Sequence, residues 1–307
     1  MAVDGKVSEF LQGQPEGVEI TPLRAPGRGP RVLTIDAEDW FHVCGHREYS
    51  DPARWDGYAP RIEATLGRLF DLLAAGGHRA TVFFLGWIAR RYRDLPREAA
   101  RRGHEIGVHG DVHRRADSLT AEQFREDLLR ARDSIESAAG VRAGVHRAAE
   151  WSIRHPGAAA LPVLASAGFR CDASMMPVPP LGRRSNLSGP HRICGEGWSL
   201  VEIPPLTGTV LGLRLPLGGA WPFRILPERR LEAAETAVRE RGEPAVFTVH
   251  PWELDAAHPP MPGLSPIQRT VHFLGLGGLP ERLHRFLERE RFVALEDALA
   301  GLQPVPA

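Results

Sequence analysis

Apolar and polar positions follow two patterns along the chain: short apolar runs and longer amphipathic stretches. Residues 31–35 form a run typical of a buried strand. In residues 60–75 the apolar side chains recur every three or four positions, which predicts a helix that ends at Gly76 and Gly77. Both patterns recur toward the C-terminus. The predicted strands are 31–35, 80–85, 105–109, 145–148, 169–172, 200–203, 245–250 and 292–295.

The alternation of strands and helices predicts an α/β fold with a mostly parallel sheet, open or closed. Thr120 and Gln123 form a capping-box pattern that predicts the start of a helix. An earlier helical stretch, after residue 85, should be interrupted near Pro96. Residues 1–30 are polar and rich in Gly and Pro, so they are expected to form a flexible tail. Residues 31–307 are expected to form one domain.

Reactive side chains stand at the ends of the predicted strands. Parallel α/β folds build their sites at the carboxyl ends of the strands, where successive loops meet. The side chains at or just beyond these ends are Asp36, His109, Arg147, Asp172 and His250. The sequence therefore predicts that they meet at one rim of the sheet.

Two histidines and a group of acids could hold a divalent metal. His109 and His113 are four positions apart, and two imidazoles with one carboxylate leave coordination positions open, as catalytic zinc sites do. Strand alternation places Asp36 and Glu38 on one side and Asp39 on the other. Alternation can fail at a strand end, so Asp39 stays a candidate ligand. In the alternative interpretation, the acids cap the next helix and the histidines are solvated in a loop.

The same residues suggest acid–base roles. A metal-bound water can have a pKa of about 7, and Asp36 would accept its proton as general base. Arg147 would keep Asp36 ionised and oriented. His250 would protonate the leaving group, with Asp172 keeping its imidazole charged. The alternatives are a surface arginine at 147 and a packed structural histidine at 250.

Three tryptophans, Trp151, Trp221 and Trp252, could provide flat surfaces for sugar rings, although core packing is an equal alternative for each. The other histidines, including His42 and His146, are interpreted as structural or solvated.

Composition narrows the class of protein. The chain has 38 basic and 38 acidic residues, so charge gives no reason to expect a nucleic acid or an anionic membrane as a partner. Its three cysteines are too scattered for a disulfide framework. No apolar run approaches the roughly 20 residues needed to span a bilayer. The first residues also lack the features of a signal peptide. We therefore expect a soluble cytoplasmic enzyme.

In order and spacing, the candidate segments resemble the five motifs of the polysaccharide deacetylases, the NodB-homology or carbohydrate esterase 4 family. The resemblance spans roughly residues 31–300. The opening Asp-x-Glu-Asp-Trp-Phe-His and the ending His-Pro-Trp-Glu-Leu-Asp most resemble the branch associated with exopolysaccharide and exosortase gene clusters. That branch carries a C-terminal extension, which residues near 177–226 and 250–285 match. The motif segments are 34–39, 109–113, 147–149, 172–174 and 249–250.

The resemblance implies a distorted (β/α)7-type barrel with a C-terminal extension. It also implies one divalent metal at the barrel mouth, commonly Zn²⁺, with Co²⁺, Mn²⁺, Ni²⁺ or Fe²⁺ as alternatives. The family removes N-acetyl and sometimes O-acetyl groups from sugars, so the implied substrate is a saccharide or amino-sugar conjugate. The resemblance assigns His109 and His113 as metal ligands, Asp36 as base and Arg147 as the arginine that steadies it. His250 matches the catalytic histidine, and Asp172 matches the acid that tunes it.

The chain departs from the family pattern at two positions. Most members have an aspartate next to the base, where this chain has Ala37, so the role of third ligand passes to Glu38, with Asp39 in reserve. Ala149 replaces the usual proline of the arginine motif, which removes a fixed φ angle behind Arg147. Two other functions remain open: hydrolysis of non-sugar linear or cyclic amides on the same fold, and carbohydrate binding without catalysis.

Overall fold

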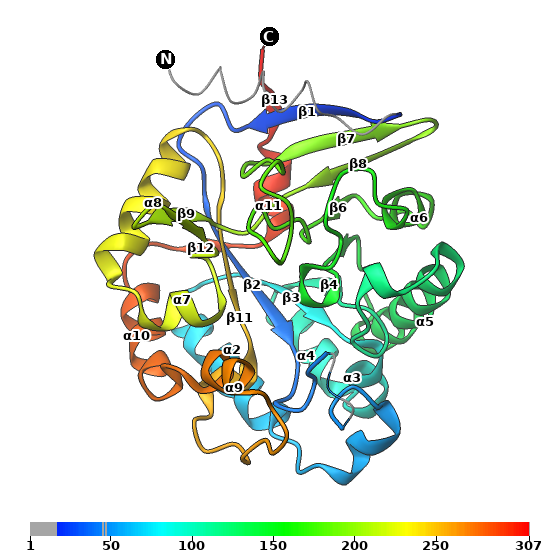
Figure 1. The fold of residues 1–307 in the computed structure, drawn as a ribbon, viewed down its shortest axis with the longest axis vertical. Helices are drawn as coiled ribbons and strands as arrows, with labels where there is room; N and C mark the ends of the chain where they lie inside the picture. The colour runs from blue at the N-terminus through cyan, green and yellow to red at the C-terminus, as the bar shows by residue number, and fades with distance from the viewer. Residues whose placement is uncertain (1–16, 45, 47, 307) are drawn as a thin grey trace.

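An 11-stranded, mostly parallel sheet organises the protein in the computed structural model, which describes residues 17–44, 46 and 48–306. The parallel strands follow the order β11-β2-β3-β4-β5-β6-β8 (Figure 1). Their bounds are β2 Arg31–Ala37, β3 Thr81–Phe84, β4 Glu105–Val108, β5 Val145–His146, β6 Cys171–Asp172, β8 Trp198–Glu202 and β11 Ala245–Val249. The predicted α/β fold with a mostly parallel sheet is confirmed.

Antiparallel strands extend the sheet beyond β8. The order continues through β7 (His191–Gly195), β1 (Glu19–Arg24) and β13 (Gln303–Pro304), which lie together at the top of Figure 1. Within the described residues the path ends at β13 without returning to β11, so the barrel-like sheet is open. A further short strand, β12 (Phe292–Val293), pairs with β2.

The expectation that residues 1–30 form a tail is wrong for the part that the structure describes. Strand β1 pairs with β7 on one side and β13 on the other, and Ile20 and Leu23 are buried. These two apolar residues give the segment something to bury, but its partners lie far away in the sequence. Residues 1–16 lie outside the described residues.

Helices cover the sheet, with α5 and α6 on one side of the view and α8 and α10 on the other (Figure 1). The predicted capping box opens α5: Thr120 accepts from the Gln123 amide, and Gln123 accepts from the Thr120 amide. The break expected near Pro96 falls earlier, after Arg91, and Pro96 lies in the first turn of α4, where proline is tolerated. The bounds are α2 Ile62–Ala75, α3 Gly86–Arg91, α4 Asp94–Arg101, α5 Ala121–Ala139, α6 Ala160–Ser166, α8 Glu228–Glu240, α10 Leu279–Leu287 and α11 Leu295–Ala300.

The second half of the chain adds elements beyond the strand–helix alternation. They include a two-stranded hairpin and short helices: β9 Gly208–Val210, β10 Leu213–Leu215, α7 Ala220–Ile225 and α9 Pro266–Phe273. The described residues also include short 3-10 turns: η1 Pro52–Gly57, η2 Ala116–Ser118, η3 Ala149–Trp151, η4 Pro251–Leu254 and η5 Leu276–Gly278. Among the described residues, no helix combines the length and the apolar character that crossing a membrane requires.

The central strand β2 is buried along its whole length, between β11 and β3. Apolar side chains such as Leu33 and Ile35 belong to the main core. Because β2 ends in this packed environment, the residues that follow it are held in place at the carboxyl rim of the sheet. A separate aromatic cluster includes Trp40 and Phe41, in the loop after β2, and Trp55.

Candidate active site and metal centre

A cavity of about 140 Å³, here called the catalytic pocket, opens at the carboxyl rim of the sheet. Its walls come from the segments that follow β2, β4, β5 and β11, the rim that the sequence predicts. The lining residues are Asp36, Glu38, His42, Val43, His109, His113, Arg147, Ala148, Glu150, Trp151 and His250.

Glu38, His109 and His113 converge in this pocket. The Glu38 Oε1 atom lies 2.9 Å from the Nε2 atoms of both histidines. All three residues are buried, and together they form a cluster with suitable ligand atoms for a metal ion. The sequence prediction of these three ligands therefore agrees with the geometry.

The hydrogen bonds behind the two histidines test whether a cation fits. His109 Nδ1 lies 2.8 Å from the Arg147 carbonyl oxygen, which can only accept, so Nδ1 carries the proton. Cys44 donates its thiol proton to the His113 carbonyl at 3.1 Å, and its sulfur lies 3.3 Å from His113 Nδ1 and can accept from it. In neutral rings both Nε2 lone pairs then face the Glu38 carboxylate.

Three electron-rich atoms so close together repel one another unless a proton or a metal ion lies between them. His113 Nε2 is also buried without a hydrogen-bond partner among the described residues. A divalent cation would satisfy all three atoms, and neutral imidazole with carboxylate is a ligand set that suits zinc. The residues present therefore fit the metal that the sequence predicts.

Asp36 lies beside this cluster and is held by Arg147. The Arg147 guanidinium donates to Asp36 Oδ1 at 2.7 Å and to the Thr34 hydroxyl at 2.8 Å. Arg147 is fully buried, and it also donates to the Ala173 carbonyl at 3.1 Å. The predicted contact between Arg147 and Asp36 is present, and a surface position for this arginine is excluded.

Asp172 does not lie against His250, so its predicted role is wrong. Its Oδ1 atom accepts from His146 Nδ1 at 2.8 Å and from the Ser174 hydroxyl at 2.7 Å. The Ser174 oxygen in turn accepts from the Ala148 amide at 2.8 Å. Because β5 and β6 pair His146 with Asp172, the aspartate supports the segment that carries Arg147 and does not reach β11.

Glu253 is the carboxylate that pairs with His250, and this partner was not predicted from the sequence. Its Oε2 atom lies 3.0 Å from His250 Nδ1 and accepts from the His250 amide at 2.9 Å. Arg224 of α7 contacts the other Glu253 oxygen at 3.4 Å. The local signal was the acid three positions after His250, which the 3-10 turn η4 folds back onto the histidine.

His250 therefore has its free nitrogen directed to the pocket. His250 Nε2 lies 3.8 Å from Asp36 Oδ2. Burial alone would lower the pKa of His250, but the hydrogen bond and charge of Glu253 outweigh it and raise the pKa to about 9. The imidazole can thus be a charged proton donor at neutral pH.

We predict that Glu253→Gln moves the alkaline limb of the pH profile of kcat/KM to lower pH by about one to two units, since the variant loses the charge that keeps His250 protonated. The profile is measured by initial rates of acetate release. The exposed Glu288→Gln is the matched control. An unmoved alkaline limb in Glu253→Gln would contradict the pairing.

The same pairing should appear in the pH dependence of folding. A histidine whose pKa is raised from 6.5 to about 9 contributes its full stabilisation below pH 6.5 and loses it as the pH rises through about 9. In Glu253→Gln this part of the dependence is expected to disappear from thermal unfolding curves.

Asp39 is not a reserve ligand, because its carboxylate caps a helix. Its Oδ2 atom accepts from the amides of Arg61 and Ile62 at 2.8 and 3.1 Å, at the start of α2, and its Oδ1 atom accepts from the Trp40 amide. The helix-capping alternative is thus correct for Asp39 and wrong for Asp36 and Glu38.

Asp39→Ala is expected to lower the free energy of unfolding by about 1–2 kcal/mol, because α2 loses its capping acceptor. The metal content of the purified protein should not change. Denaturant unfolding and elemental analysis measure the two quantities, and Asp39→Asn, which keeps one acceptor oxygen, should lose less stability. Loss of metal in Asp39→Ala would return Asp39 to the ligand set.

His42 also belongs to the pocket, although its sequence position predicted a structural or solvated histidine. Its Nδ1 atom accepts from the Asp39 amide at 2.8 Å, so its Nε2 atom carries the proton. Burial, with the nearby His113, lowers the pKa of His42 to about 3 and keeps the ring neutral. The Nε2–H donor has no hydrogen-bond partner among the described residues.

Only one of the three predicted sugar platforms reaches the pocket lining. Trp151 lines the pocket. Trp151 and the preceding Glu150 have positive φ angles, 50° and 52° respectively, a conformation that costs energy in non-glycine residues. Trp252 stacks on His272 at 4.2 Å, which covers one ring face. Neither Trp252 nor Trp221 belongs to the lining. For these two, the structure does not support the platform prediction.

Two imidazoles and a carboxylate, beside one proton acceptor and one proton donor, form the functional set of metal-assisted hydrolases. The polysaccharide deacetylase family model matches residues 56–170, and a model described as a domain of unknown function, DUF3473, matches residues 173–300. Residues 56–170 are therefore similar to the polysaccharide deacetylases. Asp36 and Glu38 precede both matched regions, so their assignment to the site rests on their contacts in the structure and not on the family models.

Comparison with solved structures gives several matches. A Mycobacterium smegmatis protein provisionally named a polysaccharide deacetylase has 22% identity and a TM-score of 0.57, over 94% of this chain and 98% of that one. A family 4 carbohydrate esterase from Streptomyces lividans in complex with acetate has 14% identity and a TM-score of 0.46, over 91% and 98%.

A family 4 pseudoenzyme from Bacillus anthracis has 12% identity and a TM-score of 0.47, over 89% of this chain and 66% of that one. No curated protein matches the chain in sequence. The comparison with the Mycobacterium smegmatis protein supports the fold, and the contacts described above carry the assignment of the site residues.

Proposed function

We propose that the protein is a metal-dependent hydrolase that removes N-acetyl groups from an amino sugar or saccharide. One observation carries the proposal: Glu38, His109 and His113 converge in the same pocket as Asp36 and His250, in a chain whose residues 56–170 are similar to the polysaccharide deacetylases. The closer resemblance to the exopolysaccharide-associated branch remains a prediction.

The metal would be held by Glu38, His109 and His113. When bound there, a divalent ion such as Zn²⁺ would supply the positive charge that polarises the amide carbonyl and makes water more acidic. The carbonyl of Arg147 and the sulfur of Cys44 orient the two imidazoles from behind.

Asp36 accepts the proton of the attacking water. Arg147 holds one carboxylate oxygen at 2.7 Å, which leaves Oδ2 to act as the base. Attack makes the amide carbon tetrahedral. His250, protonated through its pair with Glu253, donates its Nε2 proton to the amide nitrogen, and the C–N bond breaks to give acetate and a free amine.

The proton donor favours N-acetyl over O-acetyl substrates. An amine is a poor leaving group unless it is protonated, so an imidazole kept charged near neutral pH serves amide cleavage more than ester cleavage. The presence of a base, an acid and a ligand set in one pocket argues against the non-catalytic alternative.

The test is acetate release by purified protein from a panel of N-acetylated saccharides and nucleotide sugars, after chelation and after reloading with Zn²⁺, Co²⁺, Mn²⁺, Ni²⁺ or Fe²⁺. Release that depends on the added metal is the expected result. Turnover of allantoin-like rings with no acetate from any saccharide would support the non-sugar alternative. No turnover with any metal would overturn the proposal.

A further inference from the structure

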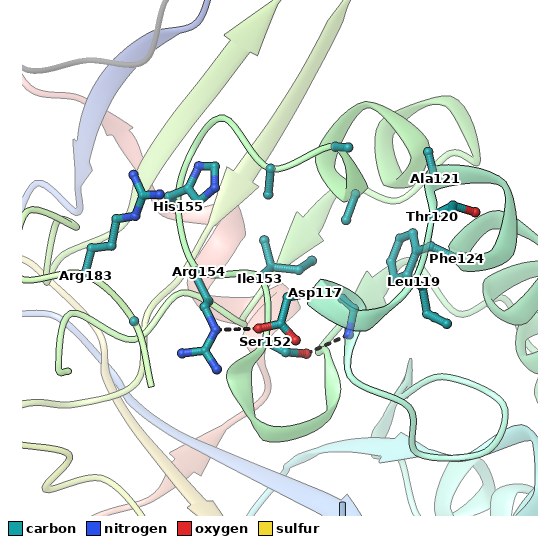
Figure 2. Close-up of a pocket in the computed structure, with 15 residues that line it drawn as sticks. Asp117, Leu119, Thr120, Ala121, Phe124, Ser152, Ile153, Arg154, His155 and Arg183 are labelled. Atoms are coloured by element: carbon teal, nitrogen blue, oxygen red, sulfur yellow. Dashed lines mark hydrogen bonds and ion pairs between the residues drawn. The ribbon is translucent and has the colours of Figure 1, made fainter. Parts of the chain in front are cut away.

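A second pocket of about 330 Å³ lies beside the catalytic pocket, on the same rim. Its walls come from the segments that follow β4, β5 and β6, which supply Asp117, Ser152 and Arg183 among others (Figure 2). Two of these segments also line the catalytic pocket. Trp151 lines the catalytic pocket, and the next residue, Ser152, lines the second pocket.

An ion-pair chain runs between the two pockets. Glu150, in the catalytic pocket, pairs with Arg115 at 3.0 Å, and Arg115 pairs with Asp117 at 2.7 Å. Asp117 then pairs with Arg154 at 2.5 Å inside the second pocket. The charges of two carboxylates and two guanidinium groups balance, so this series of ion pairs has no net charge.

Arg183 adds an unbalanced positive charge. Among the residues that the structure describes, no acidic group lies within ion-pair distance of its guanidinium. His155 stands beside it on the same side of the pocket (Figure 2). His155 Nδ1 accepts from the Gly157 amide at 3.2 Å, so its Nε2–H is a second available donor. This side of the pocket presents donors and a cation but no free carboxylate.

The opposite side is mainly apolar. Phe124, Leu119 and Ala121 lie there, with the Thr120 hydroxyl as a polar group among them, and Ile153 adds apolar surface nearer the middle of the pocket (Figure 2). A pocket with one apolar wall and polar donors facing it suits a sugar ring, which has apolar C–H faces and a polar edge. The volume lies within the usual range for small-molecule sites.

We propose that this second pocket binds an anionic sugar residue, bearing a carboxylate or a phosphate, next to the residue that is deacetylated. Arg183 pairs with the anionic group, His155 donates to a ring oxygen or hydroxyl, and the apolar wall packs against the ring. The position of this sugar next to the deacetylated residue rests on the proposed function, since only a deacetylase would need the neighbouring residue in place.

Direct binding of small sugars tests the pocket without any catalysis. Glucuronate, glucose 1-phosphate and glucose are titrated into the full-length protein and followed by ligand-observed NMR. We expect one or both anions to bind at least about tenfold more tightly than glucose, because a charge-assisted contact usually raises affinity by about this factor. The two anions separate the carboxylate source from the phosphate source. Equal binding of all three sugars would overturn the proposal, as would inorganic phosphate binding as tightly as the sugar anions.

Three variants locate the binding. Arg183→Ala should lose the preference for the anion, whereas Arg184→Ala, at the adjacent exposed position outside the pocket, should retain it. Ala159→Trp fills the pocket from an exposed lining position without changing any charge, and it should weaken all sugar binding. Unchanged binding in both Arg183→Ala and Ala159→Trp would place the ligand elsewhere and overturn the proposal.

Acetate release separates this proposal from the proposed function. A hyaluronan tetrasaccharide and N,N′,N″,N‴-tetraacetylchitotetraose supply anionic and neutral neighbours, and Arg183→Ala should raise KM only for the former. Anion binding that depends on Arg183, with no acetate from any substrate, would support the pocket and refute the deacetylase. Acetate release with identical KM changes for both substrates would support the deacetylase and refute the anionic-sugar pocket.

Discussion

Asp36→Asn is expected to lower kcat/KM for acetate release by about three orders of magnitude while the protein keeps its divalent metal. A general base typically contributes about 10² to 10⁴ to the rate. Asparagine has nearly the same shape and can still accept from Arg147, but it cannot take a proton from water. Initial rates and elemental analysis of the purified variant measure the two effects.

The metal content decides how Asp36 acts. Asp36 also belongs to a second group of possible ligand atoms, with Glu38 and His250. If Asp36→Asn lost its metal along with its activity, the aspartate would be a ligand and not the base. Activity within tenfold of the wild type would refute the mechanism altogether. The exposed Asp133→Asn on α5 controls for the loss of a carboxylate elsewhere on the surface.

Glu38→Gln is expected to lower the affinity for divalent metal by about 100-fold or more. Replacing a residue that supports a metal ligand typically lowers the metal affinity 10- to 100-fold. Glu38 is itself a predicted ligand, and the only anionic one in the predicted set, so its loss should cost at least as much. The change leaves His109 and His113 facing a neutral amide. Competition with a fluorescent chelator gives the affinity directly.

A second readout of Glu38→Gln is thermal stability. Metal that binds only the folded state raises the unfolding temperature by mass action, so the wild type should gain stability on adding Zn²⁺ and the variant should gain little. Asp39→Asn, one residue away, is the matched control and should respond like the wild type. Wild-type affinity in Glu38→Gln would mean that another carboxylate, such as Asp36, completes the site.

The positions of the main site residues could be predicted from the sequence because local rules determine them. Asp36, His109, Arg147 and His250 each follow an apolar run, and the carboxyl ends of parallel strands share one rim. The separate orientation of Asp39 also followed from alternation along β2. These inferences need only neighbours in the chain.

The errors arose where contacts depend on distant segments. Which imidazole Asp172 would meet depended on the register of β5 and β6, which pairs it with His146. No local pattern gives that register. Likewise, β1 exists because β7 and β13 pair with it, and residues 19–24 alone contain too few apolar side chains to predict a strand. Glu253 was different, since its spacing from His250 was visible in the sequence.

The pairing of β11 with β2 determines the order in which the site can be assembled. Thr34 bonds to the Phe247 carbonyl, a contact 213 residues apart in sequence, and the loop that it closes makes such pairing a slow step in folding. Glu38, His109 and His113 all lie in the first 113 residues of the chain. During synthesis the three predicted metal ligands therefore leave the ribosome well before His250, and the predicted proton donor joins them last.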